Sequence, residues 1–128
     1  MNVLDKMFGV SPAVLSLRSQ RFELISANLA NADTPGYKAV DIDFAQELAR
    51  AEGKSTRSSM SLAGISVGSD DVSPVVQYRN PWQQSLDGNT VETDQEHALF
   101  MDNAIRYQAS LNFLGGRIKS IMLALRGE

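Results

Sequence analysis

The apolar residues of this 128-residue chain form two long heptad patterns, one near each end. The first follows Ser11 and Pro12, a helix-start signal in which the serine oxygen can accept a first-turn N–H and the proline lacks an N–H that would go unpaired. Apolar residues then recur at steps of three, four or seven, interrupted once by an arginine. They are Leu15, Phe22, Ile25, Leu29 and Ala32. The pattern predicts an amphipathic helix over residues 11–33.

The second pattern is stronger and runs through four heptads in phase. Its positions are His97, Phe100, Ala104, Tyr107, Leu111, Leu114, Ile118, Ile121 and Leu125. Thr93 and Glu96 match a capping box, in which the threonine caps the helix and the glutamate reaches back. Adjacent Gly115 and Gly116 cost a helix roughly 2 kcal/mol relative to alanines, but the heptad phase continues across them. We predict one helix over residues 93–126.

The first helix is expected to end sharply. Thr34 precedes a proline and is therefore biased out of the helical region. The tetrapeptide TPGY has proline and glycine at the second and third positions of a type II turn, which makes Pro35 and Gly36 the turn residues.

A second, shorter helical signal follows the turn. Asp41 or Asp43 can cap this helix and Gly53 can end it, so residues 34–53 are predicted to form a turn and a short helix. Residues 54–92 are rich in serine and glycine, and they lack a sustained apolar period. We expect a long, flexible central segment there, in which VSPVVQY could form a short strand.

These elements predict an all-α fold, one elongated domain over residues 1–128 built on a coiled-coil-like pair of terminal helices. The C-terminal helix would be about 50 Å long and its partner about 35 Å at roughly 1.5 Å per residue. A compact chain of this length is only about 36 Å across. Part of the apolar stripe therefore lacks a partner within the chain, and unpartnered stripes mark association sites. We expect contacts between subunits at Leu15, Phe22, Ile25, Leu29, Phe100, Tyr107, Leu111, Leu114, Ile118, Ile121 and Leu125.

Composition excludes several classes of function. A net charge of −3 and scattered basic residues argue against nucleic-acid binding. The absence of cysteine excludes disulfides, thiolate metal sites and cysteine nucleophiles. No stretch has the roughly 20 apolar residues that span a bilayer, and residues 1–10 do not have the pattern of a cleaved secretory signal. Tyr78, Trp82 and Tyr107 are expected to pack rather than to stack on bases, because basic residues do not interleave with them.

No group of residues predicts catalysis, a cofactor or a metal ion, so we expect no enzyme. His97 is the only histidine and occupies a predicted core position, which favours a structural role over that of a base or ligand. Asp70 and Asp71 lack the spaced ligands of a calcium loop. Asp41 and Asp43 are better explained as helix caps than as an acid–base pair.

Three motifs carry a resemblance to a known family. SANLANADTPGYKAVDIDF resembles the N-terminal signature of the axial proteins of the bacterial flagellum, which are the rod, hook and hook-associated proteins. Together with YRNPWQQSLDGNTVETDQE and RYQASLNFLGGRIKSIM, it looks more narrowly like the proteins of the proximal rod of the basal body. The likeness covers most of residues 11–126 and is weakest over about 54–77. Glu92 replaces an aspartate of the pattern and keeps the charge.

The resemblance implies a structural subunit that is exported through the flagellar type III export apparatus without a cleaved signal and assembles in the periplasmic rod. It further implies that the terminal helices pack as a layer that lines the export channel and transmits torque. The implied partners are other copies of the chain, other proximal rod subunits, the junction protein between rod and membrane ring, and a rod cap protein. No nucleic acid or small-molecule substrate is expected.

The resemblance also favours contacts between subunits for Asn28 and Asn31, which lie on one helix face. Local capping of the helix end is the alternative for both side chains. Two alternatives for the whole chain stay open at this point: a different rod or hook subunit that shares the N-terminal signature, and a cytoplasmic coiled-coil adaptor or chaperone.

Overall fold

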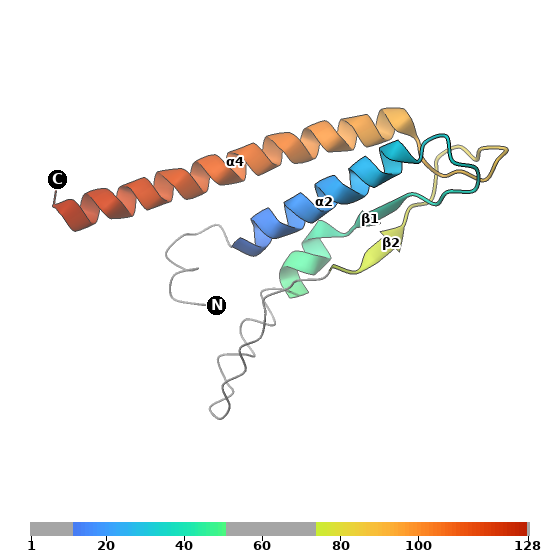
Figure 1. Ribbon diagram of the computed structural model, residues 1–128. Coiled ribbons are helices and arrows are strands. Elements are labelled where there is room, and N and C mark those ends of the chain that lie inside the picture. Colours follow the sequence, from blue (N-terminus) through green and yellow to red (C-terminus); the bar gives the residue numbers. More distant parts are fainter. Residues whose placement is uncertain (1–11, 51–73, 128) are drawn as a thin grey trace, which may run out of the picture.

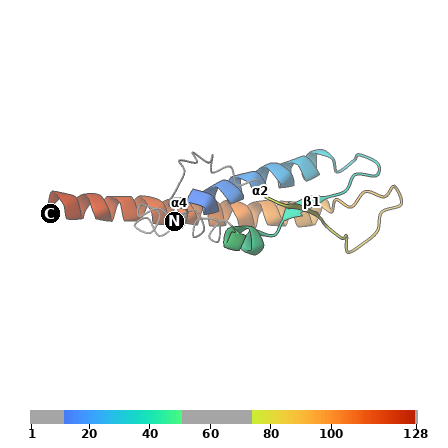
Figure 2. The ribbon, with the colours of Figure 1, turned by 90° about the horizontal axis from the view of Figure 1, so that it is seen from below.

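A computed structural model describes residues 12–50 and 74–127 of the chain. Two long helices, α2 (Pro12–Ala30) and α4 (Thr93–Arg126), lie side by side and run in opposite directions (Figures 1 and 2). Two short strands, β1 (Val40–Ile42) and β2 (Val76–Tyr78), pair along the side of α2, and residues 44–50 form part of a short helix. The elongated, mainly helical fold is confirmed, and the strands are minor additions to it.

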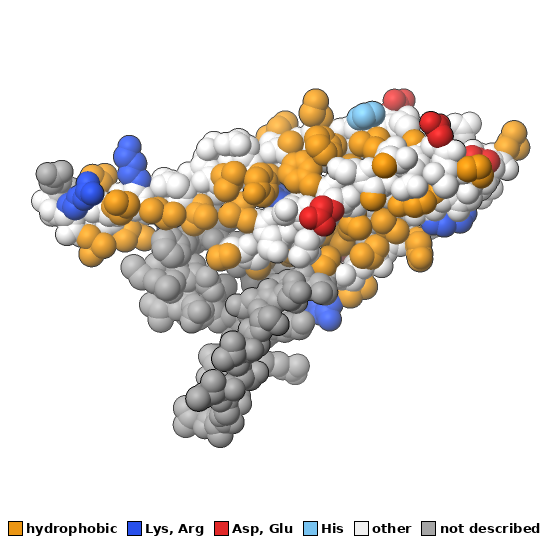
Figure 3. Space-filling model, in the orientation of Figure 1, with side chains coloured by type: hydrophobic (Ala, Val, Ile, Leu, Met, Phe, Trp, Pro, Cys, Tyr) orange, Lys and Arg blue, Asp and Glu red, His pale blue; other side chains and the backbone are white. Residues whose placement is uncertain are grey.

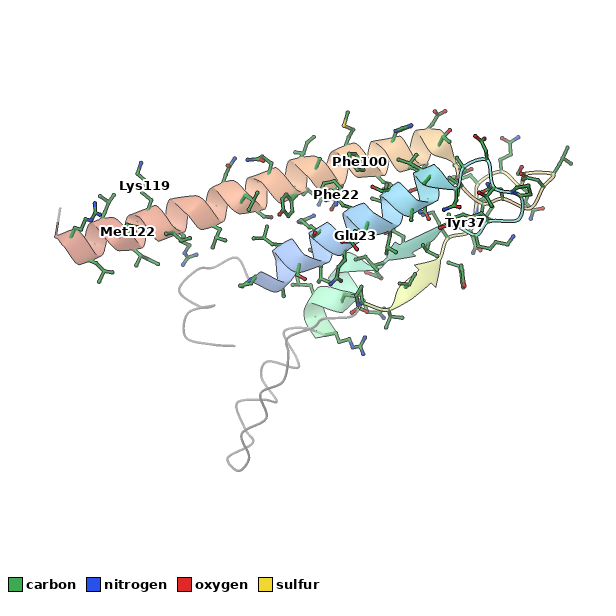
Figure 4. The ribbon with its side chains drawn as sticks, viewed as in Figure 1. Phe22, Glu23, Tyr37, Phe100, Lys119 and Met122 are labelled. Atoms are coloured by element: carbon green, nitrogen blue, oxygen red, sulfur yellow. The ribbon has the colours of Figure 1, made fainter. Side chains whose placement is uncertain are left out.

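The two helices meet through a small core. Leu17 and Ile25 of α2 are completely buried. Phe22 packs edge-on against Phe100 and Tyr107 of α4, with ring centroids 5.0 Å and 5.9 Å away, and Figure 4 shows Phe22 and Phe100 facing each other between the helices. Such T-shaped pairs add to the stabilisation from buried apolar area.

The helix alignment leaves half of α4 without a partner in the described chain. Contacts join residue 28 to 96, 22 to 100 and 18 to 103, so the start of α2 falls opposite about residue 110 of α4. α4 has 34 residues and α2 has 19, a difference in length of about 22 Å at roughly 1.5 Å per residue. The expectation that the partner covers only part of α4 therefore holds. We call residues 111–126 the α4 overhang.

The chain between the helices differs from the prediction in two ways. α2 ends at Ala30, three residues early, although the turn at Pro35 and Gly36 is confirmed. There the N–H of Tyr37 donates to the carbonyl of Thr34, and Gly36 adopts the positive φ of 72° that a type II turn requires. The turn leads into β1, a strand that the sequence analysis did not predict.

The two aspartates predicted as caps have different roles. The Asp43 carboxylate accepts the N–H of Gln46 and caps the helix that begins at residue 44, as expected. Asp41 caps nothing, because it is drawn into ion pairs with two arginines. Gly53, Asp70 and Asp71 lie outside the described residues.

The bounds predicted for the C-terminal helix are confirmed at both ends, and α4 continues through Gly115 and Gly116. The predicted capping box is wrong. Glu92 is the N-cap residue, and no side chain makes a capping hydrogen bond at this end. Glu96 does not reach back, because its carboxylate is completely buried between α4, α2 and the strand pair.

Candidate assembly surfaces and the polar joint that positions them

Five polar side chains meet where α2, α4 and the strand pair converge, and we call this cluster the polar joint. Its members are Arg21 and Asn28 of α2, Asp41 of β1, Arg79 just after β2, and Glu96 of α4. Asn28 and Glu96 are completely inaccessible to solvent. Burying charged and polar groups is costly unless each finds a partner, so the bonds within the joint decide whether it stabilises the fold.

The side chain of Asn28 forms the pair of hydrogen bonds with β1 that a neighbouring strand would form. Its side-chain amide donates to the carbonyl of Val40 at 2.8 Å, and its oxygen accepts the N–H of Val40 at 3.1 Å. The same amide nitrogen lies 3.3 Å from a carboxylate oxygen of Glu96. One buried side chain thus joins β1 to both long helices, and it satisfies backbone groups that β2 does not reach.

The arginines neutralise the two acids of the joint. Arg21 donates to both carboxylate oxygens of Asp41 at 3.0 Å each, and Arg79 adds a bond to Asp41 at 2.8 Å. Arg79 also donates to Glu96. Burial alone would raise the pKa of Asp41, but the bonds from Arg21, the N–H of Ile42 and Arg79 outweigh it and hold this pKa below its ordinary value.

The joint therefore specifies one alignment of α2, α4 and the strand pair. Shifting either helix by one residue would leave a buried carboxylate or guanidinium unpaired, which costs several kcal/mol by typical values for broken buried ion pairs. Through this alignment the joint also fixes how far α4 extends past α2.

A second set of bonds closes the chain next to the polar joint, at the end of the molecule where α2 ends and α4 begins. The side-chain amide of Asn89, which is almost fully buried, donates to the carbonyls of Asn31, Ala32 and Thr34 at 3.1, 2.8 and 2.9 Å. Its oxygen accepts the N–H of Val91 at 2.8 Å. Asn89 therefore caps the C-terminal end of α2 from another part of the chain, a role that was not predicted because residues 54–92 were expected to be flexible.

Backbone bonds complete this closure. The N–H of Gly36 donates to the carbonyl of Asp87, and the N–H of Thr90 donates to the carbonyl of Tyr37, both at 2.9 Å. Gly36 and Gly88 both have positive φ, and a Cβ added to Gly88 would lie 3.8 Å from the Cα of Gly36. Residues 87–90, part of the segment expected to be flexible, are thus tied to the turn after α2. We call this end of the molecule the head.

The α4 overhang carries exposed apolar side chains. Leu125, for example, is 83% exposed, and Figure 3 shows apolar side chains along this arm of the molecule. The exposed large apolar residues of the overhang are Leu111, Phe113, Ile118, Met122, Leu123 and Leu125. Leu114 and Ile121 are half-buried.

Three exposed large apolar side chains also lie at the head. Tyr78 is 77% exposed, Trp82 is 89% exposed and Leu86 is fully exposed. We call these three residues the head patch. The prediction that Tyr78 and Trp82 pack inside the fold is wrong for the described chain, whereas Tyr107 does pack, against Phe22.

The residues expected at contacts between subunits fall into three groups. Ile25 and Asn28 are completely buried and contact only their own chain in this arrangement, because the polar joint and the helix core enclose them. For these two residues, contact with a neighbouring subunit stays a prediction. Half-buried members are Leu15, Phe22, Leu29, Asn31, Phe100, Tyr107, Leu114 and Ile121, and exposed members are Leu111, Ile118 and Leu125.

The sequence pattern also placed Asn31 and His97 on particular helix faces. Asn31 makes local bonds, with its amide donating to Ala27 and its oxygen accepting from Thr34. His97 is exposed rather than part of the core, because the face of α4 that meets α2 is turned so that Glu96 and Asn103 are buried instead.

Residues 12–50 and 74–127 hold no group of three or more histidine, cysteine or acidic side chains placed to bind a metal ion. No helix in this part of the chain is long and apolar enough to cross a membrane.

Comparison with known proteins decides the family. A family model described as "Flagella basal body rod protein" matches residues 15–38, the part of α2 and its turn that contributes Arg21, Asn28 and Gly36. The flagellar basal body rod protein FlgB of Aeromonas hydrophila is 45% identical over 130 residues, covering 97% of this chain and 96% of the relative. The chain belongs to the FlgB family.

Other FlgB proteins support the assignment across different bacteria. The Escherichia coli K12 protein is 42% identical over 98% of this chain and 97% of its own length. A Cereibacter sphaeroides protein is 45% identical over 94% of each. As a member of the FlgB family, the chain is a structural subunit of the flagellar basal body rod, and the resemblance given by its motifs is confirmed.

Proposed function

We propose that this member of the FlgB family forms part of the proximal rod, where copies associate through their long helices to transmit torque and to line the export channel. The observation that carries the proposal is the α4 overhang, whose apolar face extends about 22 Å beyond α2 at roughly 1.5 Å per residue. An arm of this kind is suited to packing against the helices of adjacent subunits.

The face of the overhang that continues the α2 contact is the proposed interface. Leu111, Leu114, Ile118, Ile121 and Leu125 follow one another at steps of three and four, and we call them the overhang seam. Fully burying each of these side chains contributes about 1.5 to 3 kcal/mol. The overhang seam gains this burial free energy only when helices of other copies cover it. Folding of the α4 overhang is therefore coupled to assembly. The half-buried residues of the expected contact set, Asn31 among them, are proposed to complete the interface.

The partners follow from the same proposal. We infer that the chain contacts further copies of itself, other proximal rod subunits, the junction protein between rod and membrane ring, and a rod cap protein during assembly. It would reach the periplasmic rod through the flagellar type III export apparatus without a cleaved signal. The chain acts mechanically and not as an enzyme in this proposal.

The test replaces one seam residue by a charged residue. Leu111→Asp places a carboxylate on the overhang seam at a position already exposed in the single chain, so it should disturb association more than folding. We expect the variant to be exported but to leave cells unable to build rods or swim. Asn112→Asp puts the same charge on the next residue, which is exposed and lies off the seam, and these cells should swim.

Two outcomes would contradict the proposal. Cells that carry Leu111→Asp and swim normally would show that the seam is not an interface. Equal loss of swimming with Asn112→Asp would show that the charge acts by some route other than the seam. A complementary measurement is circular dichroism of the purified chain, whose helicity should rise with protein concentration.

A further inference from the structure

The two ends of the molecule carry opposite charge. Four acidic residues belong to the segments that meet at the head: Asp33 in the turn after α2, Asp87 directly after Leu86, and Glu92 and Asp94 at the start of α4. Glu92 is held beside the patch by a 3.2 Å bond from the N–H of Gln83 to its carboxylate. Bonds from the Ser85 hydroxyl and the N–H of Asn89 hold the pKa of Asp87 below its ordinary value, so this carboxyl is ionised at neutral pH.

Basic charge at the head is smaller than the acidic charge. Arg79 is neutralised within the polar joint, and Lys38, which donates to the carbonyl of Gly88 at 2.8 Å, leaves one positive charge against the four acidic residues. The head patch therefore combines exposed aromatic rings with a net negative surrounding.

The tip of α4 has the complementary chemistry. Residues 108–126 contain three basic residues and no acidic one, and the sequence adds a single acid, Glu128, after them. Lys119, Met122, Leu123 and Arg126 are spaced as i, i+3, i+4 and i+7, which places two cations and two apolar side chains on one helix face. We call this the tip face. All four side chains are exposed in the described chain.

The tip face differs from the overhang seam. At 3.6 residues per turn its centre is rotated from the seam by roughly a third of a turn. Figure 4 shows Lys119 pointing away from α2. Both faces can therefore be covered at once by different neighbours.

One molecule cannot bring the two surfaces together. They lie at opposite ends of α4, which is about 50 Å long at roughly 1.5 Å per residue. Figure 1 shows the head and the tip of α4 at the two extremities of the described chain. Contacts of head with head or tip with tip would also bring like charges together.

We propose that the head patch of one copy receives the tip face of α4 from a second copy, in a head-to-tail contact. The inference rests on the proposed self-association and adds a second interface to the overhang seam. Met122 and Leu123 would cover the apolar surface of the patch, while Lys119 and Arg126 would meet the acidic residues and the faces of Tyr78 and Trp82. A head-to-tail contact uses two different surfaces, and it extends into an open string of subunits when the rotation between neighbours does not close a ring.

Cysteine cross-linking tests this contact directly, because the full-length chain has no cysteine of its own. One preparation carries Leu86→Cys and a second carries Met122→Cys. The two are mixed under assembling conditions and mildly oxidised. The control replaces the second partner by Met101→Cys, an exposed methionine on the same helix but away from the tip face. We expect at least about tenfold more cross-linked dimer from the 86/122 pair than from the 86/101 pair.

A charge variant adds a second readout. Lys119→Glu together with Arg126→Glu in the Met122→Cys chain should lower the 86/122 yield at least about threefold, since two exposed ion pairs are replaced by repulsions. Asp94→Lys in the Leu86→Cys chain should recover part of this loss. An unchanged yield in the double glutamate variant would overturn the proposed charge pairing.

The outcomes separate the two proposals. Subunits that associate by sedimentation but give no excess of the 86/122 dimer would overturn the head-to-tail contact and leave the seam interface standing. Subunits that do not associate at any concentration would contradict both. Excess 86/122 dimer that persists in the Leu111→Asp background would establish the head-to-tail contact as independent of the seam.

Discussion

Replacing Asn28 tests whether the polar joint holds the fold together. Asn28→Ala removes three hydrogen bonds, two to the backbone of Val40 and one to Glu96, and leaves both polar groups of Val40 without that partner. Asn28→Asp has nearly the same shape but loses both donors and places a second carboxylate beside Glu96. We therefore expect the aspartate to destabilise the fold more than the alanine.

The contacts set the size of the effect. At about 1 kcal/mol for each hydrogen bond, the alanine variant should lose about 3 kcal/mol of unfolding free energy, a large part of the 5 to 15 kcal/mol that is usual for small domains. The aspartate adds repulsion of up to about 4 kcal/mol, the value for two charges 4 Å apart at an effective dielectric constant near 20. Protonation of a carboxyl group at acidic pH relieves this repulsion, so the difference between the two variants should narrow as the pH is lowered.

Urea unfolding followed by circular dichroism measures these differences. A fixed concentration of trimethylamine N-oxide favours the folded chain in all samples, and one low protein concentration keeps any contribution of assembly equal among them. A loss of about 3 kcal/mol shifts the urea midpoint by about 1 to 3 M for slopes typical of small proteins. Asn31→Ala is the matched control, because the Asn31 side chain bonds only near its own helix end, to Ala27 and Thr34.

The reasoning would be refuted by either of two results. One is an Asn28→Ala variant within about 0.5 kcal/mol of the parent chain, the range usual for substitutions away from any structural feature. The other is an Asn28→Asp variant as stable as the alanine variant at pH 7.

Two more predictions concern acid and backbone strain. The pKa of Asp41 is lower in the folded chain than its ordinary value near 3.9, so its ion pairs stabilise the fold above that pH and the contribution is lost as pH falls through the folded pKa. Urea midpoints from pH 7 to pH 2 should therefore fall less steeply for Asp41→Asn than for the parent, and parallel profiles would contradict this assignment. Gly88→Ala should cost about 1 to 2 kcal/mol because φ is +76°, whereas Gly116→Ala should stabilise α4 by up to about 1 kcal/mol because nothing lies within 4 Å of an added Cβ. A thermal midpoint that rises for Gly88→Ala, or one that falls for Gly116→Ala, would contradict the argument made for that glycine.

The C-terminal helix could be predicted from local information alone. The prediction of a helix over residues 93–126 came from the heptad phase, the absence of proline and the uninterrupted period across Gly115 and Gly116. The helix in the structure has the same bounds. The turn at Pro35 and Gly36 was equally local, since the conformational limits of proline and glycine select it. Both depend on residues adjacent in sequence.

The polar joint could not be predicted in this way. β1 has only three residues, and its hydrogen-bonding partners are β2 and the side chain of Asn28. The roles predicted for Asp41 and Glu96 were local capping, which is the commonest use of such residues near helix starts. Their actual partners, Arg21, Arg79 and Asn28, come from other segments of the chain.

By itself, the sequence determined the two helices, the sharp turn between them and an apolar stripe too long for its partner. Tertiary structure alone decided which face of α4 meets α2, because the heptad pattern marks a broad face and the buried charges select one rotation and one alignment within it. It also decided that Trp82 and Tyr78 lie outside the fold, since their exposure depends on where the strand pair and the head settle against the helices. Helix periodicity is a property of neighbouring residues, whereas the pairing of buried charges depends on segments far apart along the chain.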